Sequence, residues 1–333
     1  MSQPSPSIRT RSYPACRLCG STGSVLYSDL TDRLFAAPGR WQLKQCPRPD
    51  CGLVWLDPAP LPEDVGLAYQ EYYTHPEPVG VVAKLKYLVL SRGYRAAIAI
   101  PAILLGKYKE RREFKLMFLR QVQPGRLLDV GCGDGAFLAL MAERGWQCSG
   151  IDFDPAAVQA GREKHGLDLR AGDFQSGSFE PTDFDVITMS HLIEHVPDPV
   201  ACLDKCRQLL RPGGRLVVTT PNIHSLGHQH FKRDWRCLEP PRHLHIFAPH
   251  LLAECARRAG LAVMRTGSTA VNADYLANAS LALLNTPPDT VRIGGGWTVR
   301  YALPAIAFQC REYRAMRHDP EAGDEAFLIC ERK

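Results

Sequence analysis

Short apolar runs alternate with a helix-like segment in the middle of the chain. The run LLDV (127–130) ends in an acidic turn, and a second apolar run, CSGID, closes at Asp152. Between them, AFLALMAER (136–144) has the length and apolar content of a helix that covers a sheet. The pattern predicts a strand, a loop, a helix and a second strand, which is the repeating unit of α/β folds.

The loop after the first predicted strand carries glycine at alternate positions, Gly131, Gly133 and Gly135. Glycine allows a sharp turn and a close approach of a ligand to the main chain, because it has no Cβ. The helix that follows offers unpaired N–H groups and the positive end of its dipole. Asp152, at the end of the second strand, is placed to accept hydrogen bonds from ribose hydroxyls. Together these features predict a nucleoside site.

The string Asp129-x-Gly131-x-Gly133-x-Gly135 resembles the first motif of class I S-adenosylmethionine-dependent methyltransferases. The resemblance implies a Rossmann-like sheet of seven strands, with later strands within 184–190, 209–222, 261–267 and 325–333. It also implies that Asp129 binds the cofactor's ammonium group and that Asp173 and Phe174 contact adenine. The expected cofactor-binding residues are Asp129, Gly131, Cys132, Gly133, Gly135, Asp152, Phe153, Asp173, Phe174 and Ser190.

The segment 190–199 (SHLIEHVPDP) directly follows the fourth expected strand. It resembles the E-H-V-x-D/N-P string of small-molecule methyltransferases, in several of which the histidine is a base or a metal ligand. An oxygen or carbon acceptor has to lose a proton, so we predict His195 as the general base. Glu194 is expected to orient it or to bind a divalent ion. The alternative is that Glu194 only braces the cleft.

A long polar insertion (222–249) with five histidines and three arginines follows the fifth expected strand. A loop of this length in a compact domain is usually functional, and its place puts it over the acceptor. Arginine and histidine suit an anionic or hydroxyl-rich substrate. Its His-x-His pairs either bind metal or serve as hydrogen-bonding scaffold. The predicted substrate-binding residues are Tyr72, Tyr73, His191, His228, Trp235, Arg242 and His243; the tyrosines alternatively pack within a helix.

Four of the twelve cysteines form two spaced pairs, Cys16-x2-Cys19 and Cys46-x4-Cys51, each followed by glycine. Four thiolates in such turns predict a closed, structural Zn²⁺ site, whereas the alternative is four unrelated buried cysteines. The ion would stabilise a unit too small to bury a sufficient core. The sequence around and after these pairs resembles the N-terminal region of bacterial methyltransferases from sugar and surface-polysaccharide pathways.

With 333 residues the chain exceeds one typical domain. We expect a disordered tail (1–14), a zinc-binding unit (15–75), a helical linker or cap (76–120) and a methyltransferase domain (121–333) with insertions at 222–249 and 271–320. The apolar segments 79–119 and 271–318 contain charges and no uncharged stretch of about 20 residues that could span a bilayer. They either form a cap over the active site or lie on a membrane surface. The polar, proline-rich start predicts a cytoplasmic protein, peripheral to the inner face of the membrane if the second alternative holds.

The net charge of +5 is too small to require a nucleic-acid partner, and acidic and basic residues nearly balance over 16–60. The main expectation is methyl transfer from S-adenosylmethionine to a hydroxyl of a sugar-type acceptor that is nucleotide- or lipid-linked. The first alternative is an O-methyltransferase of quinone or polyketide hydroxyls, and the second is an RNA methyltransferase that binds through a zinc ribbon. A scaffold without activity would not need the complete cofactor motif.

Overall fold

The computed structural model describes residues 7–69, 103–177, 179, 183–288, 290–291 and 297–333. The chain forms two compact units, each assembled from separate segments. Unit 1 comprises Met1–Tyr73, Pro221–Leu251 and Ser268–Glu325, and unit 2 comprises Thr74–Thr220, Leu252–Gly267 and Ala326–Lys333. The predicted substrate residues Tyr72 and Tyr73, and residues 76–102 of the predicted helical linker, lie outside the described residues.

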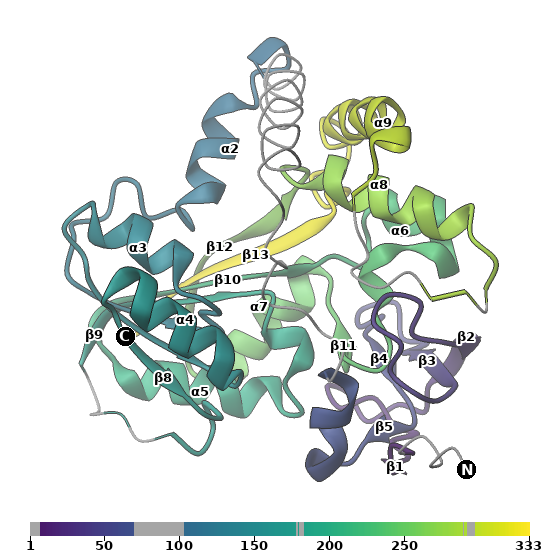
Figure 1. Ribbon diagram of the computed structural model, residues 1–333, viewed down its shortest axis with the longest axis horizontal. Coiled ribbons are helices and arrows are strands. Elements are labelled where there is room, and N and C mark those ends of the chain that lie inside the picture. Colours follow the sequence, from purple (N-terminus) through teal and green to yellow (C-terminus); the bar gives the residue numbers. More distant parts are fainter. Residues whose placement is uncertain (1–6, 70–102, 178, 180–182, 289, 292–296) are drawn as a thin grey trace. The chain divides into compact units, whose positions relative to one another are not determined.

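Unit 2 is organised around a sheet of seven strands in the order β12-β13-β10-β9-β6-β7-β8 (Figure 1). The pairs β6–β7, β6–β9, β7–β8 and β9–β10 are parallel. The order along the sheet reverses between β6 and β9, and ligands of such sheets bind at this point, beyond the carboxyl ends of the strands. The predicted Rossmann-like, seven-stranded fold is confirmed. The strands are β6 (Arg126–Val130), β7 (Gln147–Asp152), β8 (Asp168–Ala171), β9 (Phe184–Ser190), β10 (Leu210–Pro221), β12 (Ala262–Thr269) and β13 (Glu325–Glu331).

Helices connect these strands, and two of them begin at an Asp-Pro pair. Asp154 accepts hydrogen bonds from two N–H groups of the first turn of α4, and Asp198 accepts one in α5, while proline starts each helix. An acidic N-cap and a proline with a preset φ stabilise a helix start by about 1 kcal/mol or more. The helices of this part of the chain are α2 (Tyr108–Lys115), α3 (Ala136–Ala142), α4 (Pro155–His165), the single 3-10 turn η2 (Ile193–His195), α5 (Pro199–Leu209) and α7 (Pro249–Arg258).

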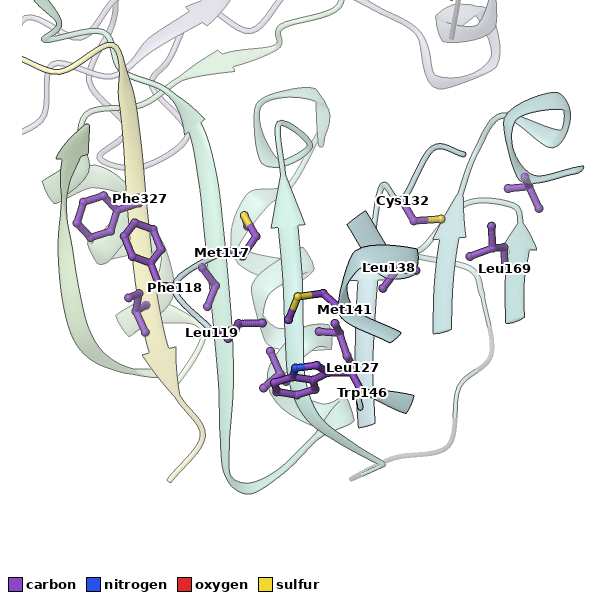
Figure 2. Close-up of a cluster of buried hydrophobic side chains, with 14 residues drawn as sticks. Met117, Phe118, Leu119, Leu127, Cys132, Leu138, Met141, Trp146, Leu169 and Phe327 are labelled. Carbon is purple, nitrogen blue, oxygen red and sulfur yellow. The ribbon is translucent and has the colours of Figure 1, made fainter. Parts of the chain in front are cut away.

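Apolar side chains from the sheet, from α3 and from the segment before β6 form the core of unit 2 (Figure 2). Phe118 precedes β6 in sequence, yet its ring centroid lies 4.7 Å from that of Phe327 on β13. Trp146, Leu127 and Leu138 are 5%, 0% and 0% exposed. Full burial of such side chains contributes about 1.5–3 kcal/mol each. This core holds the strand ends that carry the cofactor motif.

Unit 1 contains an antiparallel sheet in the order β11-β4-β3-β2. Its edge strand β11 (His245–Ile246) comes from the predicted insertion 222–249, so that insertion completes a sheet begun by N-terminal residues. The predicted disorder of 1–14 is wrong at β1, because Thr10 and Arg11 pair with Pro60 and Ala59 of β5. The other strands are β2 (Ser24–Leu30), β3 (Trp41–Gln45) and β4 (Val54–Leu56); the helical elements are η1 (Pro62–Tyr69), α6 (Leu226–Phe231), η3 (Lys232–Asp234), η4 (Arg236–Leu238), α8 (Ala273–Leu284), η5 (Val299–Tyr301) and α9 (Ala302–Ala315).

Helices α8 and α9 pack against each other within unit 1, and each has several buried side chains. Gln309 of α9 donates hydrogen bonds of 2.9 Å to the carbonyls of Ala270 and Val271 and to Asp274 Oδ1 at the start of α8. Among the described residues, no helix combines the length and apolar character needed to cross a membrane.

Candidate functional site

The turn after β6 requires all three glycines of the motif. Gly131, Gly133 and Gly135 have φ angles of 82°, 52° and 72°, in the region that favours glycine. A Cβ at Gly135 would lie 3.0 Å from Leu169 Cδ1, and a Cβ at Gly131 would lie 3.3 Å from Leu192 Cδ1. The turn is therefore packed between β8 and the segment after β9, and it brings bare main chain to the switch point of the sheet.

Asp152 ends β7 and is fixed by the main chain on both sides of its carboxylate. Oδ2 accepts the N–H of Gly133 at 2.8 Å, and Oδ1 accepts the N–H of Asp154 at 2.9 Å. The residue is 9% exposed, and this burial raises its pKa. Each oxygen keeps a further lone pair that can accept a ribose hydroxyl. The orientation therefore fits the predicted role, and Phe153 beside it is 49% exposed.

Asp129 lies one strand away from Asp152, at the end of β6. Its Oδ1 accepts the hydroxyl of Thr188 on β9 at 2.6 Å, across the switch point. Burial raises the pKa of Asp129 to about 7, and the negative charge of Asp152 adds to this, although Thr188 opposes it. A cation bound beside Asp129 would favour the ionised form. The site thus fits the ammonium end of the expected cofactor.

The two residues predicted to contact adenine, Asp173 and Phe174, differ in their exposure to solvent. Asp173 is exposed and its carboxylate accepts the N–H groups of Gln175 and Ser176 at 3.2 and 3.0 Å. Phe174 is buried, and Lys205 Nζ lies 5.1 Å from its ring centroid. Cys132 is also buried, and burial raises the pKa of its thiol. The roles of these residues in cofactor binding stay predictions.

The segment after β9 forms a polar cluster beside the glycine turn. Glu194, on η2, has a side chain that is 0% exposed; its Oε2 accepts the hydroxyl of Thr220 at 2.9 Å. Its Oε1 lies 3.5 Å from Nδ1 of His191, and a ring nitrogen of His195 lies within 4.8 Å of its carboxylate. His191 has φ of 51° and donates its N–H to the carbonyl of Thr219. The carboxylate of Glu194 therefore lies near the rings of two histidines, His191 and His195.

The sequence paired Glu194 with His195 alone, and the structure adds His191 as a second candidate base. The i,i+3 spacing of His191 and Glu194 across one turn was the signal for this pair. No sequence motif indicated two further residues of the site, Thr188 and Thr220. Each lies in an apolar strand, and its hydroxyl donates a hydrogen bond to a buried carboxylate, that of Asp129 or Glu194. Ser190, the last residue of β9, accepts a hydrogen bond from Thr219 Oγ1 at 3.1 Å.

The predicted substrate residues of the insertion contact protein partners in unit 1; Trp235, Arg242 and His243 are buried, and His228 is partly buried. His228 Nδ1 lies 2.8 Å from the carbonyl of Ile223, its Nε2 lies 3.0 Å from the hydroxyl of Tyr27, and burial lowers its pKa to about 4. Trp235 is 1% exposed, and His243 Nδ1 lies 2.7 Å from the carbonyl of Cys237. A substrate role for these side chains stays a prediction; their observed contacts connect the insertion to the N-terminal strands.

Arg242 makes the most extensive of these contacts. Its side chain is 0% exposed, and its two terminal nitrogens lie 2.7 and 3.0 Å from the carboxylate oxygens of Asp32. Its Nε donates to Glu239 at 2.9 Å, and Glu239 also pairs with Arg236. The two arginines lower the pKa of Glu239 well below its usual range despite burial. Arg242 thus connects residues far apart in sequence by a buried, charge-neutral network.

The four predicted zinc ligands meet in unit 1. Sγ atoms of Cys16, Cys19, Cys46 and Cys51 all lie within 4.8 Å of one another, with Cys16–Cys51 at 3.6 Å and Cys19–Cys46 at 3.3 Å. Tetrahedral Zn–S bonds of about 2.3 Å require S–S separations of about 3.8 Å. The glycines after the pairs, Gly20 and Gly52, have φ of 75° and 68° and donate to carbonyls inside each turn. The donor set therefore fits a Zn(Cys)₄ site.

Burial opposes ionisation of Cys19, yet hydrogen bonds from Ser21 lower its pKa to about 6. Burial raises the pKa of Cys16 and Cys51. A thiol that coordinates a metal ion is deprotonated by the ion's charge. The thiols of the two cysteine pairs would therefore be deprotonated when a metal ion is bound.

Residues 105–266 match the family model described as a methyltransferase domain. This range contains the glycine turn, Asp129, Asp152 and the Glu194 cluster. The chain therefore contains a methyltransferase domain, and the prediction of a methyltransferase is confirmed at this level.

Relatives with known names are similar over part of the chain. A ubiquinone biosynthesis O-methyltransferase of Xylella fastidiosa (strain 9a5c) is 40% identical over 104 residues, which are 29% of this chain and 42% of that protein. A protein of the same name from Alkalilimnicola ehrlichii is 35% identical over 120 residues, 34% of this chain and 48% of that protein. The chain spans less than half the length of these relatives. A solved S-adenosylmethionine-dependent methyltransferase from Mesorhizobium loti is 17% identical, covers 68% of this chain and 97% of its own, and has a TM-score of 0.46.

Proposed function

We propose that the protein transfers the methyl group of S-adenosylmethionine to a hydroxyl oxygen of a small molecule. The observation that carries this proposal is the arrangement of Asp129, Asp152 and Glu194 around the switch point of the sheet. Two carboxylates suit the ammonium and ribose ends of the cofactor, and the Glu194 cluster follows the neighbouring strand. The cofactor supplies an electrophilic methyl group with a good leaving group, so orientation of the acceptor provides much of the rate.

The residues of unit 2 would then remove the proton of the acceptor. His195 is the first candidate base and His191 the second, because each lies near the carboxylate of Glu194. A buried carboxylate beside an imidazole holds it in one orientation and stabilises its protonated form. Thr220 keeps the other oxygen of Glu194 engaged, so the carboxylate is held in place. A histidine held in this way is positioned to act as a general base.

A phenolic hydroxyl of a quinone-type acceptor is the favoured substrate class. The support is the name of the relatives, ubiquinone biosynthesis O-methyltransferase, together with 35–41% identity over 104–120 residues. This similarity covers about a third of the chain at most. The acceptor class therefore needs a direct test.

A sugar-type acceptor, nucleotide- or lipid-linked, is the second candidate. Its support is the four-cysteine cluster of unit 1, which resembles the N-terminal part of methyltransferases from sugar pathways. In this proposal Cys16, Cys19, Cys46 and Cys51 hold a structural Zn²⁺ that stabilises unit 1. All four positions of a tetrahedral ion would be filled by thiolates, so zinc would have no free position for a substrate.

Calorimetric titration with S-adenosylhomocysteine, with the zinc content measured on the same sample, tests the cofactor part of the proposal. One site per chain with a micromolar Kd supports it, and a folded, zinc-loaded protein that does not bind contradicts it. Turnover is then compared on a catechol or quinol and on nucleotide-linked sugars, with transfer of a labelled methyl group as readout. Methylation of only one class decides between the two acceptors.

Substitution separates the two candidate bases. His195→Ala is expected to lower kcat by about 10²-fold or more without changing cofactor affinity, because loss of a general base removes about that much rate. His191→Ala would then have a smaller effect, and the exposed His318→Ala is the matched control. The reverse order of effects would make His191 the base, and a loss of cofactor binding in His195→Ala would make that residue structural.

A further inference from the structure

Three side chains of unit 1 that lie far apart in sequence come together near its surface. Nδ1 of His224 is 3.4 Å from Oε2 of Glu321, and the rings of His224 and His250 have centroids 5.5 Å apart. One ligand atom from each of the three lies within 4.8 Å of the other two. We propose that His224, His250 and Glu321 form a second metal site, for a divalent transition-metal ion such as Zn²⁺, Co²⁺ or Ni²⁺.

A single buried side chain positions two of the three ligands. Asn222 is 0% exposed; its Oδ1 accepts the N–H of His224 at 3.0 Å, and its Nδ2 donates to the carbonyls of Glu321 and Gly323 at 2.6 and 2.7 Å. The main-chain N–H of Asn222 donates to the carbonyl of Asp324 at 2.9 Å. The backbones that carry His224 and Glu321 are thus held side by side by hydrogen bonds to one buried side chain.

The third ligand is placed by the same segment. Asn222 forms a parallel bridge with Phe247, and the N–H of Ile223 donates to the carbonyl of Phe247 at 2.9 Å. Phe247 is 0% exposed, and His250 follows three residues later, in the first turn of α7. Three chain segments are therefore held by one framework, with one potential ligand on each of them.

The chemistry of these donors selects the class of ion. Two imidazoles and one carboxylate suit Zn²⁺, Co²⁺, Ni²⁺ or Fe²⁺ rather than Ca²⁺ or Mg²⁺, which prefer oxygen ligands alone. Metal–nitrogen bonds of about 2.0–2.1 Å place neighbouring ligand atoms about 3.3 Å apart in a tetrahedron. The side chains of His224 and Glu321 are 42% and 39% exposed, so they have room to rotate toward an ion. Water would fill the remaining positions.

An exposed His–Glu ion pair without a metal is the alternative for His224 and Glu321, and it would contribute little to stability. That pair has no need of His250. Dependence of metal binding on all three residues therefore distinguishes the two explanations, and it does not require that the acceptor or the methyl-transfer activity be known.

The test is a titration of zinc-loaded, full-length protein with Co²⁺, followed by its visible absorption. We expect one additional equivalent with weak d–d bands and without the intense near-ultraviolet band of a Co–thiolate bond. His224→Ala, His250→Ala and Glu321→Gln should each weaken this binding by at least about 10-fold, as expected for loss of a ligand. His318→Ala, an exposed histidine outside the cluster, should bind like the unaltered protein.

Circular dichroism and the melting temperature without Co²⁺ control for misfolding, and Glu321→Gln is the mildest of the changes. Unaltered protein that binds no additional Co²⁺ would overturn the proposal. Co²⁺ binding that is unchanged in His250→Ala would also overturn the proposal, since the ion would then be bound by His224 and Glu321 alone or at a different site. A Co–thiolate band would show that the ion had entered the four-cysteine cluster instead, and it would also count against the proposal.

Discussion

Binding of S-adenosylhomocysteine is expected to weaken in mild acid, because Asp129 has to be ionised to bind the ligand's ammonium group. Burial, assisted by the charge of Asp152, raises the pKa of Asp129 to about 7 in the free protein. The bound ammonium group favours the carboxylate, so binding at pH values below 7 must displace a proton. Above that pH the carboxylate is already ionised, and the affinity stays nearly constant.

The magnitude follows from one proton with a pKa of about 7. The ionised fraction is about 0.9 at pH 8 and about 0.1 at pH 6, so the Kd should rise about 10-fold between these values. Calorimetric titration at pH 6, 7 and 8, in buffers of differing ionisation enthalpy, measures both the affinity and the protons released. Asp129→Asn should bind more weakly at pH 8 and lose most of this pH dependence.

Thr188→Val provides a second check on the same group. The hydroxyl of Thr188 stabilises the ionised form through its 2.6 Å hydrogen bond to Oδ1 of Asp129. A hydrogen bond to a charged group contributes about 1.5 kcal/mol or more, so its loss should move the midpoint of the pH profile upward by about one unit. A profile in the Asp129→Asn variant as steep as in the unaltered protein would refute this reasoning and point to Asp152 as the titrating group.

Further predictions concern the ribose acid, the buried ion network and the cysteines. Asp152→Ala should raise the Kd for S-adenosylhomocysteine by about 10²-fold, since two charge-assisted hydrogen bonds are lost; an unchanged Kd by calorimetry would contradict its role. Arg242→Met should lower the free energy of unfolding by about 3–5 kcal/mol, measured by urea titration of tryptophan fluorescence, because the buried carboxylate of Asp32 loses its arginine and that of Glu239 keeps only Arg236. Arg40→Ala, which breaks a pair exposed by 61% and 64%, should cost less than about 1 kcal/mol, and equal costs would refute the comparison. Cys46→Ser should abolish the zinc content measured by mass spectrometry and lower the melting temperature; a zinc-free unaltered protein would rule the site out.

Much of unit 2 was predictable because its local signals agree with one another. The run 184–190 is β9 to the residue, and the predicted helix from Ala136 is α3. Apolar strands, a glycine turn and Asp-Pro helix starts are all short-range features, so each can be read without knowing the rest of the fold. The strand order then follows from the known rules for such sheets.

Unit 1 shows what short-range signals cannot reveal. Nothing in the sequence indicated that the insertion 222–249 contributes β11, which pairs with β4 near the other end of the chain. Arg242 and His228 were predicted as substrate ligands, and that role stays a prediction. An arginine or histidine in a polar loop carries no mark of the protein side chain with which it will pair. That partner is Asp32 for the first and Tyr27 for the second, each about 200 residues away.

The sequence by itself determined the class of the catalytic domain, the glycine turn, Asp129 and Asp152 as cofactor candidates, and the spacing of the four cysteines. These depend on residue type and near neighbours, where steric and hydrogen-bonding rules apply locally. Only the tertiary structure decided that Glu194 serves His191 as well as His195, that Thr188 and Thr220 hold the buried carboxylates, and that His224, His250 and Glu321 meet. Such pairings depend on which distant segments pack together, and that is set by burial of the whole chain rather than by any one motif.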